Sequence, residues 1–265
     1  MSAFDPARFA EHARAAGLRL GEPLVYASST GSTNDDALRA ARRGQASGSV
    51  FVADHQSHGR GRSGSAWQSG AGENLLFSLL LRPSAGAFPG AALTLTAGLA
   101  VRAALAELSG QTLGVKWPND VLAGSKKLAG ILCEGQLAAN GAFEALVIGV
   151  GVNVETRAFP PELEAIATSL WLTHRDARPE LPPREALLVR VLGELERYLE
   201  RYFSSGFAAL EREFAEHDVL SGRRVSVAGP RPLVGVARGV DDQGQLLVEH
   251  ENGLERVTSG TIRPE

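Results

Sequence analysis

The pattern of the chain changes near Asp218, and this change most constrains what the chain can fold into. Before it, segments with the spacing of amphipathic helices alternate with short apolar runs typical of buried strands. After it, short β-branched segments are separated by polar turns, which is typical of a small β-barrel. We therefore predict two domains, residues 1–218 with both helices and strands, and residues 219–265 with strands alone.

The helices and strands follow from periodicity, caps and turn residues. We expect Ser32 or Thr33 to cap a helix as half of a capping box with Asp35 or Asp36, and Asn140-Gly141 to form a hairpin turn. The expected helices span residues 6–16, 33–43, 91–108, 187–202 and 207–216. The expected strands span residues 24–28, 49–54, 74–81, 115–117, 121–122, 127–135, 143–154, 224–228, 233–240, 245–250 and 254–258.

Composition excludes several classes of protein. The chain has 265 residues and a net charge of −3, so it lacks the basic surplus of a general nucleic-acid binder. Cys133 is the only cysteine, which excludes a disulfide scaffold and suits a reducing compartment. We find no signal peptide, and polar residues interrupt the apolar stretch 91–108, so we expect a buried helix, no membrane partner and a cytoplasmic location.

A loop rich in glycine and arginine, residues 56–67, is the first candidate site. Glycines allow backbone amides to approach a ligand closely and to form an anion-binding nest. Arg60 and Arg62 add charge-assisted donors, and Trp67 offers a surface for stacking on a planar base. This loop therefore indicates anion binding, although an ordinary surface loop would have the same composition.

Lysine is confined to one region of the chain. Of 27 basic residues, only Lys116, Lys126 and Lys127 are lysines, and they surround the segment Trp117-Pro118-Asn119-Asp120. Because lysine is a compact point charge and arginine a wide fork, this restriction favours a site that requires an ammonium group. We expect Lys127 on a strand to act in that site and Asp120 to be its partner or a ligand of magnesium.

Two further segments offer polar or close contacts to a ligand. Ser32-Thr33-Asn34 begins a predicted helix and exposes hydroxyl, amide and backbone donors, although a plain helix cap also explains it. Gly149 and Gly151 alternate on a predicted strand and clear one face of it. We find no phosphate-binding P-loop and no nucleophile elbow.

Taken together, these segments resemble the biotin protein ligase family. The resemblance covers residues 26–153 and, more loosely, the C-terminal segment. It rests on Ser32-Thr33-Asn34, Gln56-x2-Gly59-Arg60-Gly61-Arg62, Lys116-Trp117-Pro118-Asn119-Asp120, Lys127-Leu128-Ala129-Gly130-Ile131 and Gly149-x-Gly151-x-Asn153.

The resemblance implies a fold and a reaction. The fold is an α/β (α+β) domain with a mixed sheet, of the class II aminoacyl-tRNA synthetase and biotin ligase type, followed by an SH3-like barrel. In the reaction, biotin and ATP form biotinyl-5′-AMP and pyrophosphate, with Mg²⁺ accompanying ATP. A lysine of a biotin carboxyl carrier domain then takes the biotinyl group and releases AMP.

The resemblance also assigns roles to residues. Lys127, Arg62 and Asp120 are the expected catalytic residues, and the glycine-rich loop is expected to close over the adenylate. The expected biotin contacts are Ser32, Thr33, Asn34, Gln56, Gly59, Arg60, Gly61, Arg62, Lys127, Gly130 and Gly151. The expected ATP contacts are Arg62, Trp67, Lys116, Asn119, Asp120, Lys127 and Asn153.

Some features depart from the family pattern. Ser65 stands where the family often has arginine, so one phosphate contact is expected to be missing. Only a short segment precedes the first predicted strand, so we expect neither an N-terminal DNA-binding domain nor a DNA partner. The oligomeric state stays open, because an exposed sheet edge can pair two chains in a homodimer.

Two alternatives remain. A lipoyl or octanoyl ligase shares the catalytic fold, but the glycine–arginine loop together with Lys116-Trp117-Pro118-Asn119-Asp120 favours biotin. A binding module built on an inactive enzyme would use the C-terminal domain to hold a protein. The presence of Lys127 and of both loop arginines argues against loss of activity.

Overall fold

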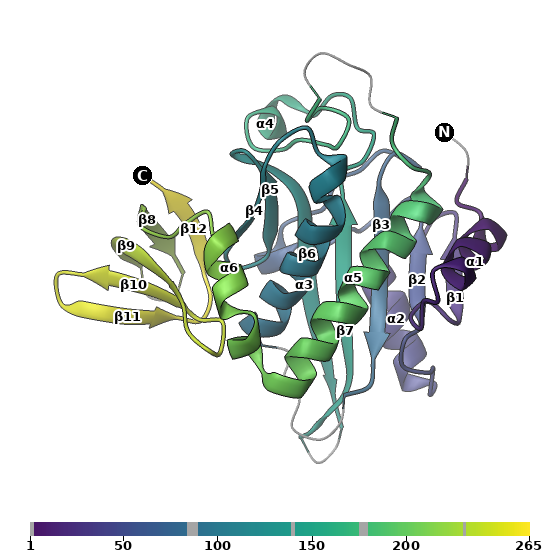
Figure 1. Ribbon diagram of the computed structural model, residues 1–265, viewed down its shortest axis with the longest axis horizontal. Coiled ribbons are helices and arrows are strands. Elements are labelled where there is room, and N and C mark those ends of the chain that lie inside the picture. Colours follow the sequence, from purple (N-terminus) through teal and green to yellow (C-terminus); the bar gives the residue numbers. More distant parts are fainter. Residues whose placement is uncertain (1–2, 84–89, 139–140, 175–179, 230–231) are drawn as a thin grey trace.

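The computed structural model describes residues 3–83, 90–138, 141–174, 180–229 and 232–265. These residues form a seven-stranded mixed sheet with helices on both faces, and a separate five-stranded antiparallel sheet at the C-terminal end (Figure 1). Asn140 lies outside the described residues, so the expected hairpin turn at Asn140-Gly141 stays a prediction.

The large sheet has the strand order β1-β2-β3-β7-β6-β5-β4. β1 and β2 are parallel, and every other neighbouring pair is antiparallel, so the mixed sheet implied by the resemblance is confirmed. The strands are β1 (Leu24–Ala27), β2 (Val50–Ala53), β3 (Leu75–Leu81), β4 (Leu113–Lys116), β5 (Asp120–Ala123), β6 (Lys126–Leu137) and β7 (Phe143–Val152).

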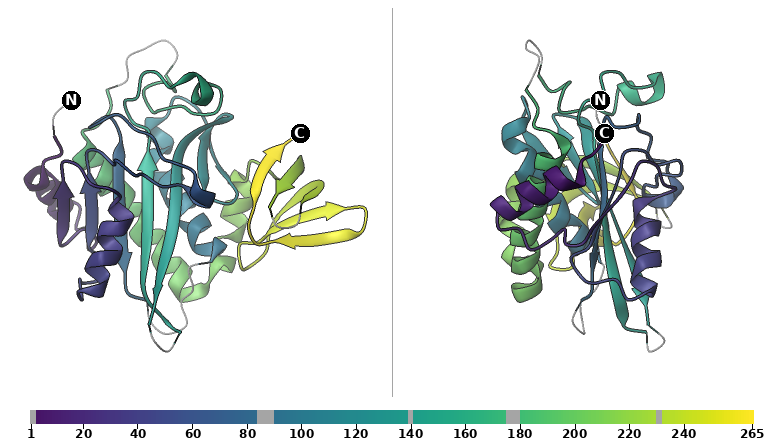
Figure 2. Two further views of the ribbon diagram at one scale, coloured as in Figure 1. Left: turned by 180° about the vertical axis from the view of Figure 1, so that it is seen from behind. Right: turned by 90° about the vertical axis from the view of Figure 1, so that its right-hand side faces the viewer.

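The two faces of this sheet are covered differently. α1 (Pro6–Ala15), α3 (Ala91–Leu105) and α5 (Arg184–Ser205) lie on one face over the main apolar core (Figure 2). α2 (Thr33–Arg42) lies on the other face and buries alanines against Phe51, Leu80 and Val147. The second face is therefore covered only in part by α2, and this leaves room beside the helix for a pocket.

The segment Ala91–Leu108 is long and apolar enough to cross a membrane by length and composition alone. In this fold it is α3 followed by one 3₁₀ turn, η2 (Ala106–Leu108). Most of its apolar residues are buried against the sheet and α5, and Leu95 and Leu99 are fully buried. The expected buried helix is confirmed, because a helix that is apolar on all sides needs partners on all sides.

The remaining helical segments are short. The expected helix over residues 207–216 is divided into a 3₁₀ turn and α6, which ends at His217, one residue before the predicted domain boundary. The segments are η1 (Arg62–Gly64), α4 (Pro161–Glu164), η3 (Phe207–Ala209) and α6 (Glu211–His217).

The C-terminal sheet has the strand order β11-β10-β9-β8-β12. Its four predicted strands are confirmed, and a fifth, β12, was not predicted from the sequence; closure into an SH3-like barrel stays a prediction. The strands are β8 (Arg224–Ala228), β9 (Leu233–Val240), β10 (Leu246–His250), β11 (Gly253–Val257) and β12 (Thr261–Pro264).

The turn between β9 and β10 joins the two sheets. The carbonyl of Gln243 accepts a hydrogen bond from the amide of Ala92 at the start of α3, at 3.2 Å. The carbonyl of Gly244 accepts one from the indole of the fully buried Trp117, at 2.9 Å. A side chain at Gly244 would place its Cβ 2.4 Å from the amide nitrogen of Ala92, so this close contact requires glycine.

Candidate active site

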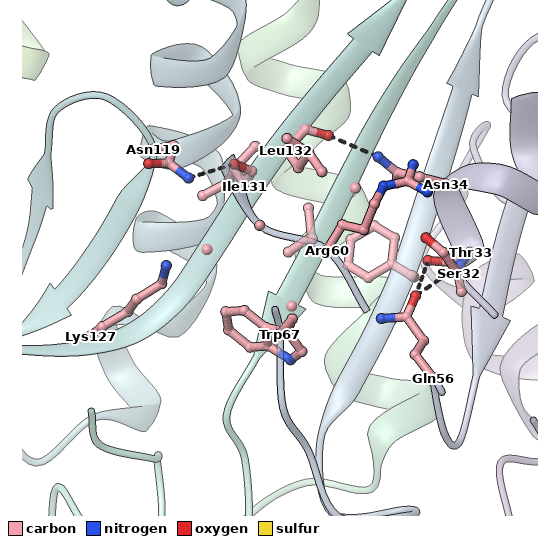
Figure 3. A pocket seen from close by; sticks show the side chains of 16 residues that line it. Ser32, Thr33, Asn34, Gln56, Arg60, Trp67, Asn119, Lys127, Ile131 and Leu132 are labelled. Carbon is pink, nitrogen blue, oxygen red and sulfur yellow. Dashed lines mark hydrogen bonds between the residues drawn. The ribbon is translucent and has the colours of Figure 1, made fainter. Parts of the chain in front are cut away.

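A pocket with about 450 Å³ of empty space, part of which is open solvent, lies on the α2 face of the sheet (Figure 3). Its lining comes from the first turn of α2, the loop after β2, the turn between β4 and β5, and strands β3, β6 and β7. Residues from all five sequence segments that support the resemblance therefore meet in one place. The lining residues are Ser32, Thr33, Asn34, Gln56, Arg60, Gly61, Trp67, Phe77, Asn119, Lys127, Gly130, Ile131, Leu132, Gly149, Val150 and Gly151.

The start of α2 differs from the expected capping box. Ser32 occupies the N-cap position, but its side chain makes no capping hydrogen bond. Instead, Gln56 Oε1 accepts hydrogen bonds from the Thr33 amide at 2.8 Å and from the Thr33 hydroxyl at 3.0 Å. The expectation of a capping box was wrong because a side chain from another segment takes over the capping. The Ser32 hydroxyl is thereby left on the pocket wall.

Ser78 on β3 is a site residue that sequence reasoning missed. It is fully buried, and its hydroxyl lies 2.7 Å from Thr33 Oγ1 and 2.5 Å from Asn34 Oδ1. The available signal was a single polar residue within the apolar run 75–81, all of which is buried. Because buried polar groups require partners, such a serine indicates a polar cluster on one face of the strand.

The orientation of Asn34 is set by its neighbours. Its amide nitrogen donates to the carboxylate of Glu134 at 2.6 Å and to the carbonyl of Leu132 at 3.3 Å. Both partners are acceptors only, so the amide oxygen must face Ser78. Gly149 leaves room for the Asn34 side chain, because a Cβ at residue 149 would lie 2.1 Å from Asn34 Oδ1.

Trp67 lies flat across a pair of glycines. Gly130 on β6 is directly opposite Gly151 on β7, and a Cβ on either would lie 2.6 to 3.0 Å from the indole ring. The indole nitrogen is buried and has no hydrogen-bond partner among the described residues. The two glycines thus form a flat platform that accommodates an aromatic ring, and the orphaned donor on that ring is left for a ligand to satisfy.

The loop that carries Trp67 is a small hairpin. Trp67 donates to the carbonyl of Gly59 at 2.9 Å, and Gly61 donates to the carbonyl of Ser65 at 2.7 Å. The hydroxyl of Ser65 closes the tip by donating to the carbonyl of Arg62 at 2.8 Å. Ser65, in place of the family's frequent arginine, therefore has a local role in shaping the turn.

Arg60 is held by two carboxylates. Its guanidinium donates to Asp35 at 2.6 Å and to both oxygens of Glu134 at 2.9 and 3.1 Å. The hydrogen bond to Asp35, followed by that to Glu134, raises the pKa of Arg60 against the opposing effect of partial burial. In this structure the side chain therefore fastens the loop to α2 and β6, and the predicted contact of Arg60 with biotin stays a prediction.

A charged cluster lies around Lys127 at one edge of the pocket; Lys127 lines the pocket, whereas Asp120 lies outside its lining and Lys116 lines a separate pocket. Lys127 Nζ lies 2.6 Å from Asp120 Oδ1 and 5.4 Å from the centre of the Trp67 ring. Lys116 is directly opposite Asp120 in the pairing of β4 and β5. Burial lowers the pKa of Lys116, and the neighbouring Lys127 lowers it further while Asp120 raises it. Two ammonium groups and one carboxylate thus meet where the sequence predicts anion chemistry.

Arg62 does not line this pocket but lines a second, more open one. Its guanidinium lies 6.0 Å from the centre of the Trp117 ring, and burial lowers its pKa while nearby Asp120 raises it. This pocket has about 920 Å³ of open space and includes the N-terminal end of α3. Also lining it are Cys133, whose buried thiol has a pKa raised to about 12, and Gln243 from the C-terminal sheet.

The two asparagines expected to contact ATP are placed differently. Asn119 lines the pocket, with its amide donating to the carbonyl of Ile131 at 3.0 Å. Asn153 is buried outside the lining, and its amide donates to the carbonyl of Thr168 at 2.9 Å. In this structure Asn153 holds the segment after α4 against the sheet, and its contact with ATP stays a prediction.

A metal site built from protein groups alone is absent among the described residues, since no cluster of three histidine, cysteine or acidic side chains occurs there. Asp120 is the carboxylate at the charged end of the pocket. Mg²⁺ in nucleotide sites is commonly held by one or two carboxylates together with phosphate oxygens. The residues present therefore fit a magnesium ion that arrives with its own phosphate ligands, and Asp120 is the carboxylate that would hold it.

Comparison with protein families identifies two regions of the chain. Residues 26–153 match the Biotin/lipoate A/B protein ligase family, and residues 220–263 match the Biotin protein ligase C terminal domain. These regions contain the pocket and the C-terminal sheet, respectively.

Individual relatives cover most of the chain. The biotin–[acetyl-CoA-carboxylase] ligase of Mycobacterium tuberculosis is 37% identical over 248 residues, which cover 90% of this chain and 88% of that protein. The bifunctional ligase/repressor BirA of Bacillus subtilis is 33% identical over 92% of this chain and 74% of its own length. Among solved structures, biotin protein ligase from Aquifex aeolicus in complex with biotin and ATP has a TM-score of 0.78 at 30% identity, covering 91% of this chain and 99% of that one.

Proposed function

The chain belongs to the Biotin/lipoate A/B protein ligase family, and from this premise we propose that it activates biotin with ATP and transfers it to a carrier lysine. One observation carries the proposal: a single pocket has the hydrogen-bonding side chains of Thr33, Asn34 and Gln56 at one end and the ammonium group of Lys127 at the other. Such a pocket matches a ligand that is polar but uncharged at its head and carries a carboxylate at its tail.

The neutral end suits the ureido ring of biotin. That ring has two N–H donors and one carbonyl acceptor, and Thr33, Asn34 and Gln56 supply both kinds of partner. A dithiolane ring, as in lipoate, would leave these groups unpaired, which costs more than a lost contact between apolar groups. The pocket therefore favours biotin over lipoate within the family.

In the first step, a carboxylate oxygen of biotin attacks the α-phosphorus of ATP, and the bond to the β-phosphate oxygen breaks. The products are biotinyl-5′-AMP and pyrophosphate. We assign Lys127 to the reacting groups, because its ammonium reduces the repulsion between two anions and stabilises charge in the transition state. Its place on β6, with Asp120 and Trp67 on either side, keeps that ammonium in position.

The nucleotide is assigned to the region next to Lys127, where β4, the turn between β4 and β5, and the loop tip lie beside the pocket. Lys116, Arg62 and Asn119 come from those segments, and the two charged groups are half-buried, so their interactions with phosphate are poorly screened. We assign the stacking of adenine to Trp67 and the magnesium contact to Asp120, where the ion would neutralise phosphate charge.

In the second step, the amine of a lysine on a biotin carboxyl carrier domain attacks the acyl carbon of the mixed anhydride. An amide forms, AMP leaves, and the amine loses a proton. We assign Asp120 to accept that proton, since it is the carboxylate at the reacting end of the pocket. The loop hairpin would shield the anhydride from water until the carrier arrives.

The direct test is biotin-dependent exchange of pyrophosphate into ATP, with lipoate as the control acid. We expect exchange with biotin and magnesium, no exchange with lipoate, and transfer of biotin to an added carrier domain. Exchange with lipoate alone would move the chain to the lipoate branch of the family. Absence of exchange with both acids would refute an adenylating activity.

A further inference from the structure

Three segments that are distant in sequence meet at the carboxylate of Glu134. Asn34 comes from the first turn of α2, Arg60 from the loop hairpin, and Glu134 itself from the part of β6 that extends beyond β5. One Glu134 oxygen, Oε2, accepts from both Asn34 and Arg60, at 2.6 and 2.9 Å. The same carboxylate therefore contacts a side chain of the pocket wall and the side chain that fastens the loop.

This arrangement is selective for a carboxylate at position 134. The amide nitrogen of Asn34 and the guanidinium of Arg60 are both donors, so they can share only an acceptor with several lone pairs. Asp35 binds the far side of Arg60 at 2.6 Å, and within the described part of the chain its carboxylate makes no hydrogen bond with the side chain of Asn34. Only Glu134 of these two carboxylates therefore links the pocket wall to the loop.

We propose that Glu134 is a positioning residue that couples the binding of biotin at Asn34 to closure of the loop through Arg60. The proposal rests on the proposed function for the identity of the ligand. It assigns Glu134 no contact with the reacting atoms.

The coupling follows from the hydrogen bonds that Glu134 and Asn34 lose when the loop opens. When the loop opens, Arg60 leaves Glu134, and the carboxylate is then held by Asn34 alone and is free to turn toward solvent. The Asn34 amide, whose oxygen is directed by Ser78, is then held on the nitrogen side mainly by its longer hydrogen bond to the carbonyl of Leu132, at 3.3 Å. A ligand that requires the oriented Asn34 thus favours the closed loop, and a closed loop favours the ligand, as reciprocal coupling requires.

Two substitutions separate the contacts of Glu134. Glu134→Gln keeps an oxygen at the Oε2 position, which can still accept from Asn34, but it removes the negative charge and the second acceptor, Oε1, of Arg60, so the loop contact alone is weakened. Glu134→Ala breaks both contacts. Glu144→Gln is the matched control, because Glu144 lies on the same β6–β7 hairpin and contacts Gln136 and Arg82 rather than the loop.

The first measurement is the rate of trypsin cleavage after Arg62 in the ligand-free protein. We expect E134Q to be cleaved about two- to fivefold faster than the wild type, the factor that corresponds to weakening one partly exposed ion pair. E144Q should be cleaved at the wild-type rate. A double variant, E134Q with Arg60→Gln, should be cleaved no faster than R60Q alone; additive acceleration would refute the link through Arg60.

The second measurement is the Kd for biotin, by calorimetry. E134A should bind biotin more weakly than E134Q, because E134A alone also releases Asn34, and E134Q more weakly than the wild type. Equal affinities of E134A and E134Q, or cleavage of E134Q at the rate of E144Q, would overturn the inference. If the wild type fails to bind biotin, the proposed function fails, and the ligand-free cleavage rates still decide whether Glu134 holds the loop.

Discussion

Replacement of Ser78 by alanine tests the polar end of the pocket. Ser78 has one hydroxyl proton and two acceptors within 2.7 Å, Thr33 Oγ1 and Asn34 Oδ1. Ser78→Ala therefore removes one hydrogen bond rather than two, and leaves a buried acceptor unsatisfied. A loss of this kind costs about 1–3 kcal/mol, or roughly 5- to 150-fold in an equilibrium constant.

We expect most of that cost to appear in biotin binding, because Thr33 and Asn34 are the groups that Ser78 orients. The assay is a biotin titration of pyrophosphate exchange, with KM expected to rise and kcat to stay near the wild-type value. Ser49→Ala is the matched control: Ser49 is also fully buried, and its hydroxyl bonds the carbonyl of Ala46, which is not among the pocket-lining residues. If S78A lowers the melting temperature as S49A does but leaves KM for biotin unchanged, the assigned role of Ser78 is wrong.

Three other predictions concern the charged end, the glycine platform and the domain junction. Lys127→Ala should lower kcat of pyrophosphate exchange by about 10²–10³-fold, as for other removed transition-state donors; wild-type exchange in this variant would exclude Lys127 from the chemistry. Gly151→Ala places a methyl group 2.6 Å from the indole of Trp67, so the ring should leave the platform, with a shift in its fluorescence and weaker nucleotide binding; an unchanged spectrum would contradict the platform. Burial raises the pKa of Asp218 to about 6. Between about pH 4 and 6 the folded state therefore binds more protons than the unfolded state. The free energy of unfolding should fall as the pH rises through that range. Asp218→Asn should remove this fall, as followed by melting temperature against pH, and a parallel profile in both proteins would refute it.

Much of the fold could be predicted because local signals agreed with tertiary structure. β3 and α3 are so apolar that each had to be buried, and their predicted ranges, residues 74–81 and 91–108, begin and end within one residue of β3 and of α3 with its 3₁₀ turn. β12 was not predicted, because a short strand at the end of a sheet has little apolar content and depends on its pairing with β8.

The site was predictable as a set of segments but not as a set of contacts. Motif residues such as Thr33 and Lys127 were found because their chemistry is visible in the sequence. Ser78 and Glu134 were missed because each acts through a neighbour, and those neighbours come from other segments of the chain. The partners of Arg60 were unpredictable for the same reason: the sequence shows a free cation, whereas the fold places two carboxylates beside it.

The indole of Trp117 gives the C-terminal sheet a part in the stability of the first domain. Its hydrogen-bond acceptor, the carbonyl of Gly244, lies more than one hundred residues away along the chain. A chain cut after α6 would leave that donor buried without a partner beside Lys116, Asn119 and Asp120. The two sheets are therefore not interchangeable modules. A chimera that takes its C-terminal sheet from a relative must retain the β9–β10 turn, and thermal unfolding should proceed as one cooperative transition.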